Sequence, residues 1–291
     1  MSSAGFAHHG GRLGAARTEY PQAPQPWIDL STGINPRAYP APRAQRLALN
    51  RLPDVGDLRR LEAVAAAAFG VNDPERVVAT GGTEPALRLL PHVLSLSHAI
   101  VAAPTYGSHA DGWQAAGVPT DLVADSWLEQ SIADRTAVVV VNPNNPDGRV
   151  LSRKRLQQLH DAAAQRGGVL VVDEAFAETV PQSSVAPLAG TQAAENLLVL
   201  RSFGKFYGLA GLRLGFVIGA RKWVTRARSA IGDWPVSADA LAAGLAAYAD
   251  LQWAERMRVQ LARSARRLDE LLIAGGFGIV GGTSLYRLAQ G

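Results

Sequence analysis

The chain has 291 residues, of which 47% are hydrophobic and 19% are charged, a composition typical of a compact protein with a large core. No apolar run reaches the roughly 18 residues that a membrane span requires, and the first 17 residues contain no apolar stretch like that of a signal peptide. Cysteine is absent, which excludes disulfides and thiol chemistry. We therefore expect a cytoplasmic protein of one large or two unequal domains, with no membrane partner.

The positive charge of the chain is spread rather than clustered. The formal net charge is +4 and the pI is about 9.7. Arginines are scattered along residues 153–166 and 256–267, where they alternate with Gln, Glu and Ala as on a solvated helix face. The charge fits the attraction of a small anionic substrate as well as it fits nucleic acid, and we expect no nucleic-acid partner.

An irregular, Pro-rich arm occupies residues 1–53. Prolines recur from residue 21 onwards, and the arm also contains the aromatic residues Tyr20, Trp27 and Tyr39. A flexible linker has no need of such large apolar side chains. We therefore expect the arm to lie across the body of the protein or across a partner subunit.

Short β-branched runs alternate with helical patterns between residues 54 and 236. Strands this apolar are buried on both faces, and their alternation with helices indicates a mainly parallel sheet and the α/β class. The predicted strands cover residues 77–79, 99–103, 137–141, 169–172, 197–200 and 214–218, and the predicted helices cover residues 84–96, 108–116 and 152–165.

Residues 237–291 have a different pattern. An Ala-rich helical stretch runs from Ser237 to about Ala274, and residues 275–288 predict a turn followed by a strand. We interpret this part as a linking helix and the start of a second, small domain, which leaves residues 54–236 as the large domain.

Lysine use is the first indication of chemistry. The chain has 29 Lys plus Arg residues, but the only lysines are Lys154, Lys205 and Lys222. Lys205 follows a predicted buried strand and lies among aromatic residues and glycines, whereas the other two lie in surface-like sequences. An amine, unlike a guanidinium, can lose its proton in an apolar site and attack a carbonyl carbon. Lys205 is therefore a candidate nucleophile, with an ordinary surface lysine as the alternative.

Asp173 is the second candidate, because it lies at the carboxyl end of a predicted buried strand, where α/β sheets bind ligands. A buried carboxylate needs a cationic partner, which a protonated pyridine nitrogen would supply. A metal-binding Asp, or an Asp-Glu pair that caps the next turn, would give the same pattern.

Three further segments follow predicted strands. Gly81-Gly82-Thr83-Glu84 gives a glycine turn and a helix start, where free N–H groups suit a phosphate. The turn at residues 142–148 carries three asparagines and two prolines and would hold an amide side chain at the sheet edge. Ser202 and Arg213 flank the lysine and could hold a phosphate dianion. Each of these segments, taken alone, is also compatible with a purely structural turn.

These motifs, in this order, resemble those of the fold type I pyridoxal-phosphate (PLP) enzymes of the class I/II aminotransferase group. The resemblance covers the chain from about Gly33 onwards and rests on Asn-Pro-Asn-Asn-Pro-x-Gly, Asp-Glu-Ala-Phe, and Ser-x-x-Lys with Gly-Leu-Arg-x-Gly. It implies a three-layer α/β/α large domain with a mainly parallel sheet, a small C-terminal domain, PLP as the cofactor and a homodimer.

The resemblance also implies roles for residues that match the family pattern. Lys205 is similar to the lysine that forms a Schiff base with PLP and carries protons, and Asp173 to the acid that keeps the pyridine nitrogen protonated. Asn145 would donate to the phenolic oxygen of the ring, and Tyr106 would stack on its face. The other cofactor-binding residues implied are Gly82, Thr83, Glu84, Phe176, Ser202 and Arg213. The cofactor then supplies the carbanion chemistry, and the protein orients the bond to be broken.

The chain departs from the family pattern in several places. Phe176 and Leu52 stand where many relatives have Tyr, in the second case a Tyr that reaches the phosphate of the neighbouring subunit. No residue matches the Arg that binds the substrate carboxylate, and Arg287 lies in the preceding strand-like segment. Because relatives normally continue for tens of residues past a point like Gly291, we expect a truncated chain with an incomplete small domain.

Within the family, residues 8–11, residues 30–36 and Asp-Glu-Ala-Phe look like the threonine-phosphate decarboxylases of cobalamin biosynthesis, which convert O-phospho-L-threonine to (R)-1-amino-2-propanol phosphate. They also resemble histidinol-phosphate aminotransferases. We expect decarboxylation, with Gly33 and Asn35 contacting a small phosphorylated amino-acid substrate; transamination and PLP binding without turnover are the alternatives. The remaining histidines, which have no metal spacing, are expected to be structural or exposed: His92, His98, His109 and His160.

Overall fold

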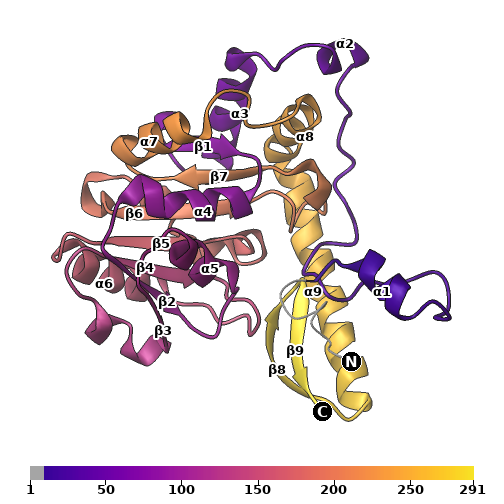
Figure 1. Ribbon diagram of the computed structural model, residues 1–291. Coiled ribbons are helices and arrows are strands. Elements are labelled where there is room, and N and C mark those ends of the chain that lie inside the picture. The colour runs from indigo at the N-terminus through magenta and orange to yellow at the C-terminus, as the bar shows by residue number, and fades with distance from the viewer. Residues whose placement is uncertain (1–9) are drawn as a thin grey trace.

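The computed structural model describes residues 10–291, so His8 and His9 lie outside the described residues. Its centre is a seven-stranded sheet in the order β1-β7-β6-β5-β4-β2-β3 (Figure 1). Neighbouring strands from β3 to β6 pair in parallel, whereas β7 pairs antiparallel with both β1 and β6. The strands are β1 (Val77–Thr80), β2 (His98–Ala102), β3 (Thr120–Val123), β4 (Thr136–Val141), β5 (Val169–Asp173), β6 (Leu197–Ser202) and β7 (Gly215–Ile218). The predicted α/β fold with a mainly parallel sheet is confirmed.

The central strands form because they are apolar along their whole length. Every residue of β1, β4, β5, β6 and β7 is buried, as expected for strands covered by helices on both faces. The edge strand β3 is partly exposed throughout and contains Asp121. This polar, short segment has no buried-strand pattern, which explains why the sequence analysis did not predict it.

Helices pack on both faces of the sheet and complete three layers (Figure 1). One hydrophobic cluster joins the sheet to α4 (Thr83–Leu94), α5 (Ser108–Ala115) and α7 (Arg221–Ile231). The other cluster joins the opposite face to α3 (Val55–Ala68), α6 (Arg153–Ala164) and α8 (Ala238–Ala249). The predicted α/β/α arrangement is therefore confirmed, with α3 and α7 as additional helices.

The described part of the arm lies across the body. It contains the short helices α1 (Leu13–Glu19) and α2 (Arg46–Leu49), and the chain between them passes alongside α9 (Leu251–Ala274) (Figure 1). Tyr39 is buried there and meets Trp253 edge-on, with the ring centroids 5.0 Å apart. These contacts are of the kind expected from the aromatic residues of the arm.

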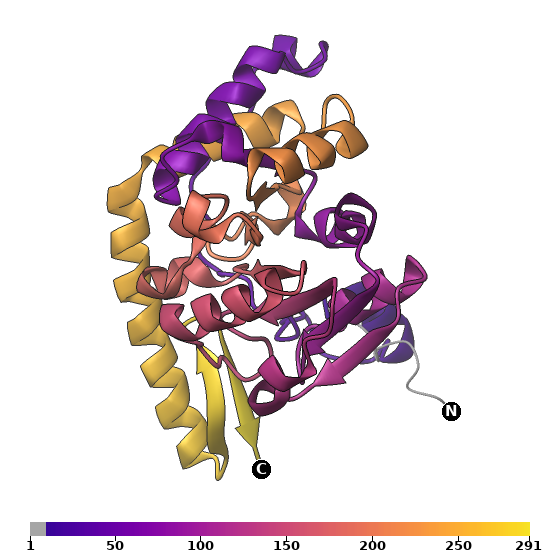
Figure 2. The ribbon, with the colours of Figure 1, turned by 90° about the vertical axis from the view of Figure 1, so that its left-hand side faces the viewer.

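The C-terminal part consists of two helices and a hairpin. Asp250 interrupts the predicted helical stretch, because its carboxylate accepts a hydrogen bond from Trp253 N at 2.9 Å and starts α9 after the end of α8. The antiparallel strands β8 (Gly278–Thr283) and β9 (Tyr286–Gln290) then fold back beside α9 (Figure 2). The division into an arm, a large domain and a small domain stays a prediction.

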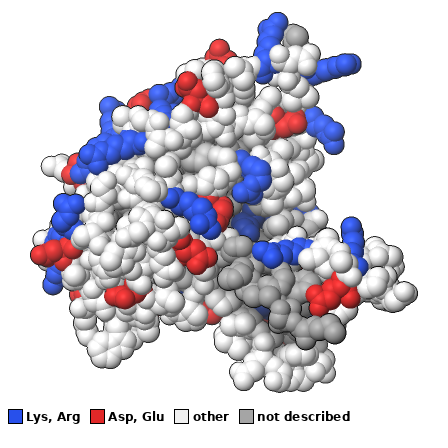
Figure 3. All heavy atoms as spheres, in the orientation of Figure 1, with Lys and Arg blue, Asp and Glu red and all other residues white. Residues whose placement is uncertain are grey.

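The surface and the helices bear on two further expectations. Basic and acidic side chains are interspersed on the face shown in Figure 3. No helix among residues 10–291 has both the length and the apolar character needed to cross a membrane. The cytoplasmic location and the absence of a nucleic-acid partner stay predictions.

Candidate active site

One cavity at the carboxyl ends of β4, β5 and β6 collects the residues predicted to bind a cofactor. Parallel strands end at the same edge of the sheet, and α4 begins at this edge after β1. The sequence-predicted residues that line the cavity are Gly82, Thr83, Glu84, Tyr106, Asn145, Asp173, Phe176, Ser202, Lys205 and Arg213. The structure therefore brings together side chains that are spread over more than 130 residues of sequence.

One end of the cavity is suited to an anion. Gly82 precedes α4 with a φ of 98°, and a Cβ atom there would lie 2.7 Å from Nη2 of Arg213. Only a glycine allows the guanidinium to approach the helix N-terminus this closely. Ser202 lines the same end. Among residues 10–291 no carboxylate forms an ion pair with Arg213, whose Nη1 donates to the carbonyl of Ala210 at 3.2 Å. The guanidinium, the hydroxyl and the positive end of the helix dipole together form a phosphate-binding set.

The cavity is also lined by an acid. Asp173 is the last residue of β5 and is 4% exposed. One of its carboxylate oxygens accepts a hydrogen bond from the backbone N–H of Ala175, at 2.9 Å. The other oxygen lies 2.9 Å from Nε2 of His109, which is 2% exposed. Asp173 thus lines the cavity, and the imidazole of His109 contacts its carboxylate.

His109 is a site residue for which the sequence analysis predicted no chemical role. It lies three residues after Tyr106, and the two rings meet edge-on at 6.2 Å. Tyr106 and His109 are both close to the start of α5. One helical turn therefore separates Tyr106, which lines the cavity, from His109, which contacts Asp173. That spacing is present in the sequence, but it has meaning only once Asp173 is known to lie opposite.

Lys205 lines the same cavity and is close enough to Asp173 and Arg213 for both charges to act on its amine. Burial lowers the pKa of its amine; the charge of Asp173 opposes this effect, and the charge of Arg213 adds to it. Its Nζ lies 5.7 Å from the centre of the Phe176 ring. A lowered pKa increases the fraction of neutral amine, which is the nucleophilic form.

Tyr106 forms another wall, and polar contacts fix its orientation. Its hydroxyl donates to Oε2 of Glu84 at 3.2 Å, and Nε of Arg88 donates to Oε1 of the same carboxylate at 2.9 Å. Burial raises the pKa of Tyr106, so its hydroxyl stays protonated. Glu84 therefore serves this site as the residue that holds an aromatic ring in place.

A second cavity of about 330 Å³ adjoins the first. The two cavities share Tyr106, Asn145, Phe176 and Lys205, so Lys205 is accessible from both. Apart from Pro146, which lies in the turn after β4, the rest of the second cavity comes from the arm and the C-terminal hairpin, namely Gly10, Leu30, Ser31, Thr32, Gly33, Tyr286, Arg287 and Leu288. This side is the space in which a substrate can meet the lysine.

Gly33, which is predicted to contact the substrate, lines the second cavity. A Cβ atom at this position would lie 2.9 Å from Cδ1 of Tyr286 and 3.1 Å from Cε1 of Phe176. These two rings meet at 4.9 Å between centroids, and the Tyr286 hydroxyl donates to the carbonyl of Asn144. Because Gly33 has no side chain, the arm, the hairpin and the large domain can pack closely at this point.

Asn35, the other residue predicted to contact substrate, lines neither of these cavities. It is 2% exposed, and its side-chain amide donates to the carbonyl of Phe206 at 2.8 Å. The structure therefore places Asn35 behind the loop that carries Lys205. The sequence pattern could not distinguish the two positions, because Gly33 and Asn35 are only two residues apart.

Arg287 borders the second cavity, but its guanidinium is already bound. Nη2 and Nε donate to the two carboxylate oxygens of Asp269, the first at 3.0 Å, and Nη1 donates to the carbonyl of Thr283. This engagement agrees with the sequence-based view that Arg287 is not the residue that binds a substrate carboxylate.

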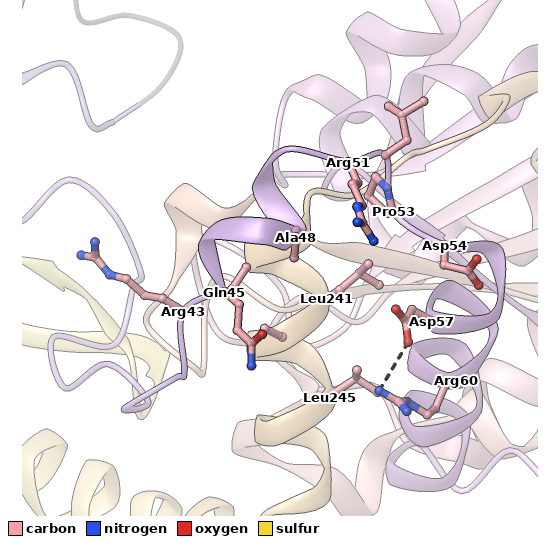
Figure 4. Close-up of a pocket in the computed structure, with 14 residues that line it drawn as sticks. Arg43, Gln45, Ala48, Arg51, Pro53, Asp54, Asp57, Arg60, Leu241 and Leu245 are labelled. Carbon is pink, nitrogen blue, oxygen red and sulfur yellow. Dashed lines mark ion pairs between the residues drawn. The ribbon is translucent and has the colours of Figure 1, made fainter.

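A separate groove lies away from this site, between α2, α3 and α8 (Figure 4). It has a volume of about 550 Å³, and an ion pair of 3.4 Å joins Arg60 to Asp57 within it. None of the predicted site residues lines it. Among residues 10–291 no group of His, Asp and Glu side chains is arranged to hold a metal ion.

Comparisons with known proteins place the chain in a family. The family model of the class I and II aminotransferases matches residues 27–287. The chain is 38% identical to a threonine-phosphate decarboxylase from Pseudomonas aeruginosa, over 96% of this chain and 82% of that protein. It is also 38% identical to a threonine-phosphate decarboxylase from a Sinorhizobium species, over 97% and 83% of the two chains.

A solved structure agrees at the level of the fold. The histidinol-phosphate aminotransferase from Sinorhizobium meliloti, in complex with pyridoxal-5'-phosphate, superposes with a TM-score of 0.69 at 22% identity, over 82% of this chain and 67% of that chain. The match to the family model and the two 38% identical relatives confirm the predicted family: the chain belongs to the class I and II aminotransferases.

Proposed function

We propose that the first cavity binds pyridoxal 5'-phosphate. The residues fit this group because an anion-binding set, a carboxylate and a half-buried lysine line the same cavity. Gly82, Thr83, Ser202 and Arg213 would hold the phosphate, and Asp173 would pair with the protonated pyridine nitrogen. When bound, the cofactor supplies an electron sink for a bond broken at the α-carbon of an amino acid.

The residues of the chain have distinct tasks in this proposal. Lys205 attaches the cofactor and then, as a free amine, carries a proton to or from the substrate α-carbon. His109 holds the Asp173 carboxylate in place, with its Nε2 2.9 Å from one carboxylate oxygen. Tyr106 and Phe176 line the cavity that would take the ring, and Asn145 would donate to the ring oxygen.

We further propose that the reaction is the decarboxylation of O-phospho-L-threonine. The observation that carries this proposal is the 38% identity to two threonine-phosphate decarboxylases over nearly the whole chain. The substrate enters the second cavity, and the reaction depends on which bond of its α-carbon is held perpendicular to the ring. A carboxylate held there is lost as carbon dioxide, whereas a hydrogen held there leads to transamination, as in the histidinol-phosphate aminotransferases.

The experiment that tests this proposal is a product assay. Purified protein with PLP and O-phospho-L-threonine should release carbon dioxide and the phosphorylated amino alcohol. Formation of a keto acid that depends on an added amino acceptor would instead establish an aminotransferase. If neither product forms although the cofactor binds, the protein binds PLP without turnover.

We also propose a homodimer whose contact includes the surface around α2 and the start of α3. Leu49, Leu52, Val55 and Trp234 are each more than half exposed there. Leu52 borders the groove between α2, α3 and α8, and Val55 borders a second hollow that shares Pro53 and Asp54 with it. Exposed apolar groups gathered in this way favour burial against another protein surface. Light scattering after size-exclusion chromatography should give twice the mass of the chain, and Leu52→Glu should lower it toward the monomer mass.

A further inference from the structure

The arm is hydrogen-bonded to the loop that carries the candidate cofactor lysine. The backbone N–H of Asn35 donates to the carbonyl of Lys205 at 3.0 Å, and the N–H of Tyr39 donates to the carbonyl of Tyr207 at 2.9 Å. Between them, the Asn35 side chain donates to the carbonyl of Phe206 at 2.8 Å. Three successive carbonyls of the lysine loop thus accept hydrogen bonds from two residues of the arm, Asn35 and Tyr39.

The Asn35 side chain is itself held in one orientation. Its Oδ1 accepts the backbone N–H of Arg37 at 2.9 Å, which forms a local turn and directs the amide nitrogen toward Phe206. Because Asn35 is almost fully buried and lines neither cavity beside Lys205, a substrate in those cavities does not reach it directly.

The position of the Lys205 side chain depends on its backbone more than that of a lysine held in an ion pair. Among residues 10–291 its Nζ forms no ion pair that would fix the end of the side chain. The aromatic side chains of the loop anchor the other side of the backbone, since Phe203 and Tyr207 stack at 4.8 Å and Tyr207 stacks on Trp253 at 5.6 Å. The backbone at residue 205 is therefore set between an aromatic cluster and the arm.

We propose that Asn35 is a positioning residue for Lys205: by fixing the Lys205–Phe206 backbone, it holds the amine at the junction of the two cavities. This assignment rests on the proposed function of Lys205. It differs from the sequence-based hypothesis, in which Asn35 contacts the substrate. The same arm segment lines the second cavity at residues 30–33, so contacts made by a substrate with the arm lie only a few residues from the support of the lysine.

The three lysines of the chain allow a direct test. In cofactor-free protein, the rate of labelling by an amine reagent can be followed against pH for each lysine by peptide mass spectrometry. Lys154 and Lys222 are exposed and serve as internal references. The charged and titratable groups that line the two cavities together with Lys205 are Glu84, Tyr106, Asp173, Arg213, Tyr286 and Arg287, and none of them is changed in the variants below.

Two substitutions and one control distinguish a residue that positions Lys205 from a residue that contacts the substrate. Asn35→Ala removes the amide, and Asn35→Asp keeps the acceptor for Arg37 but loses the donor to Phe206. Asn196→Ala is the matched control, because the Asn196 amide also donates to a backbone carbonyl, that of Gly168 at 3.1 Å, at the opposite end of the sheet.

In both Asn35 variants, the labelling curve of Lys205 should give a higher pKa than in the wild-type protein. A looser loop is less buried, and burial lowers this pKa. The control should leave it unchanged. With the cofactor bound, both variants should show a kcat about 10-fold lower with KM changed less than about twofold, since misplacement of a catalytic group reduces the rate more than binding.

Two results would overturn the proposal. An unchanged Lys205 labelling curve in both variants would show that Asn35 does not position the amine. A rise in KM alone, with kcat and labelling as in wild type, would show a substrate contact. If wild-type protein releases no carbon dioxide, the proposed reaction fails, but the labelling curves still decide the role of Asn35.

Discussion

The two cavities around Lys205 are built in different ways. The first is made by loops at the ends of neighbouring strands, and each of its residues belongs to a short motif that follows a strand or starts a helix. The second is closed by the arm and the C-terminal hairpin, whose residues Gly33 and Tyr286 are about 250 positions apart in the sequence. The sheet thus determines the cofactor side, whereas long-range packing of peripheral segments determines the substrate side.

Because the two cavities are built differently, substitutions in each should affect different steps. Changes on the sheet side should affect cofactor binding and the chemical step. Changes on the arm and hairpin side should affect substrate binding and leave the bound cofactor unaltered. The predictions below test this separation, from the largest expected effect to the smallest.

Lys205→Ala should reduce turnover by about 10⁴-fold or more, because both cofactor attachment and proton transfer are lost. The measurement is carbon dioxide release with saturating PLP and phosphothreonine. Lys222→Ala is the control, since its amine lies on the surface, 3.4 Å from the carboxylate of Glu195 and 5.2 Å from the centre of the Trp223 ring. Retention of full turnover by Lys205→Ala would rule out the assigned role.

Asp173→Asn should lower kcat by about 10²- to 10³-fold, because a neutral amide does not keep the ring nitrogen protonated. His109→Phe should give a smaller loss, since the carboxylate remains. The matched control is Asp121→Asn, which removes another Asp–His contact, 3.0 Å long, at the exposed sheet edge. Equal effects of Asp173→Asn and Asp121→Asn would contradict the account.

Arg213→Met should weaken cofactor binding by about 10- to 100-fold, since a hydrogen bond to a charged group contributes about 1.5–3 kcal/mol. The dissociation constant of PLP can be followed by its absorbance. Arg221→Met, which removes an exposed ion pair of 3.0 Å with Asp73, should leave binding unchanged. If Arg213→Met raised only the KM for substrate, the first cavity would bind the substrate rather than the cofactor, which would contradict the assignment.

Gly33→Ala should act on the substrate side alone. The added methyl group would displace Tyr286 or Phe176, at a cost of about 1–3 kcal/mol. We expect KM to rise about 5-fold with little change in PLP affinity. Gly14→Ala is the control, because a Cβ atom at that position meets nothing within 4 Å. A loss of PLP binding in Gly33→Ala would break the separation of the two sides.

The same comparison explains how much the sequence could predict. Lys205, Asp173 and Arg213 follow apolar strands directly, so local patterns and the rule that ligands bind at strand ends bring them to one edge. By contrast, the sequence could not show that His109 faces Asp173 or that Asn35 lies behind Lys205. These contacts join segments 64 and 171 residues apart, and only the packed structure specifies them.

Secondary structure shows the same limit. The buried strands were predicted because they are uniformly apolar, whereas β3 is half-exposed at the edge. The break between α8 and α9 depends on a single cap at Asp250 within an Ala-rich stretch, and periodicity alone does not reveal it.

The central claim, that Lys205 is the attachment point of the cofactor, can be tested by borohydride reduction of the PLP-loaded protein and peptide mass spectrometry. Only three lysines are present, so the position of the label is unambiguous. We predict a single pyridoxyl group on the peptide that contains Lys205. A label on Lys154 or Lys222, or no label at a PLP concentration that saturates the absorbance change, would contradict the account.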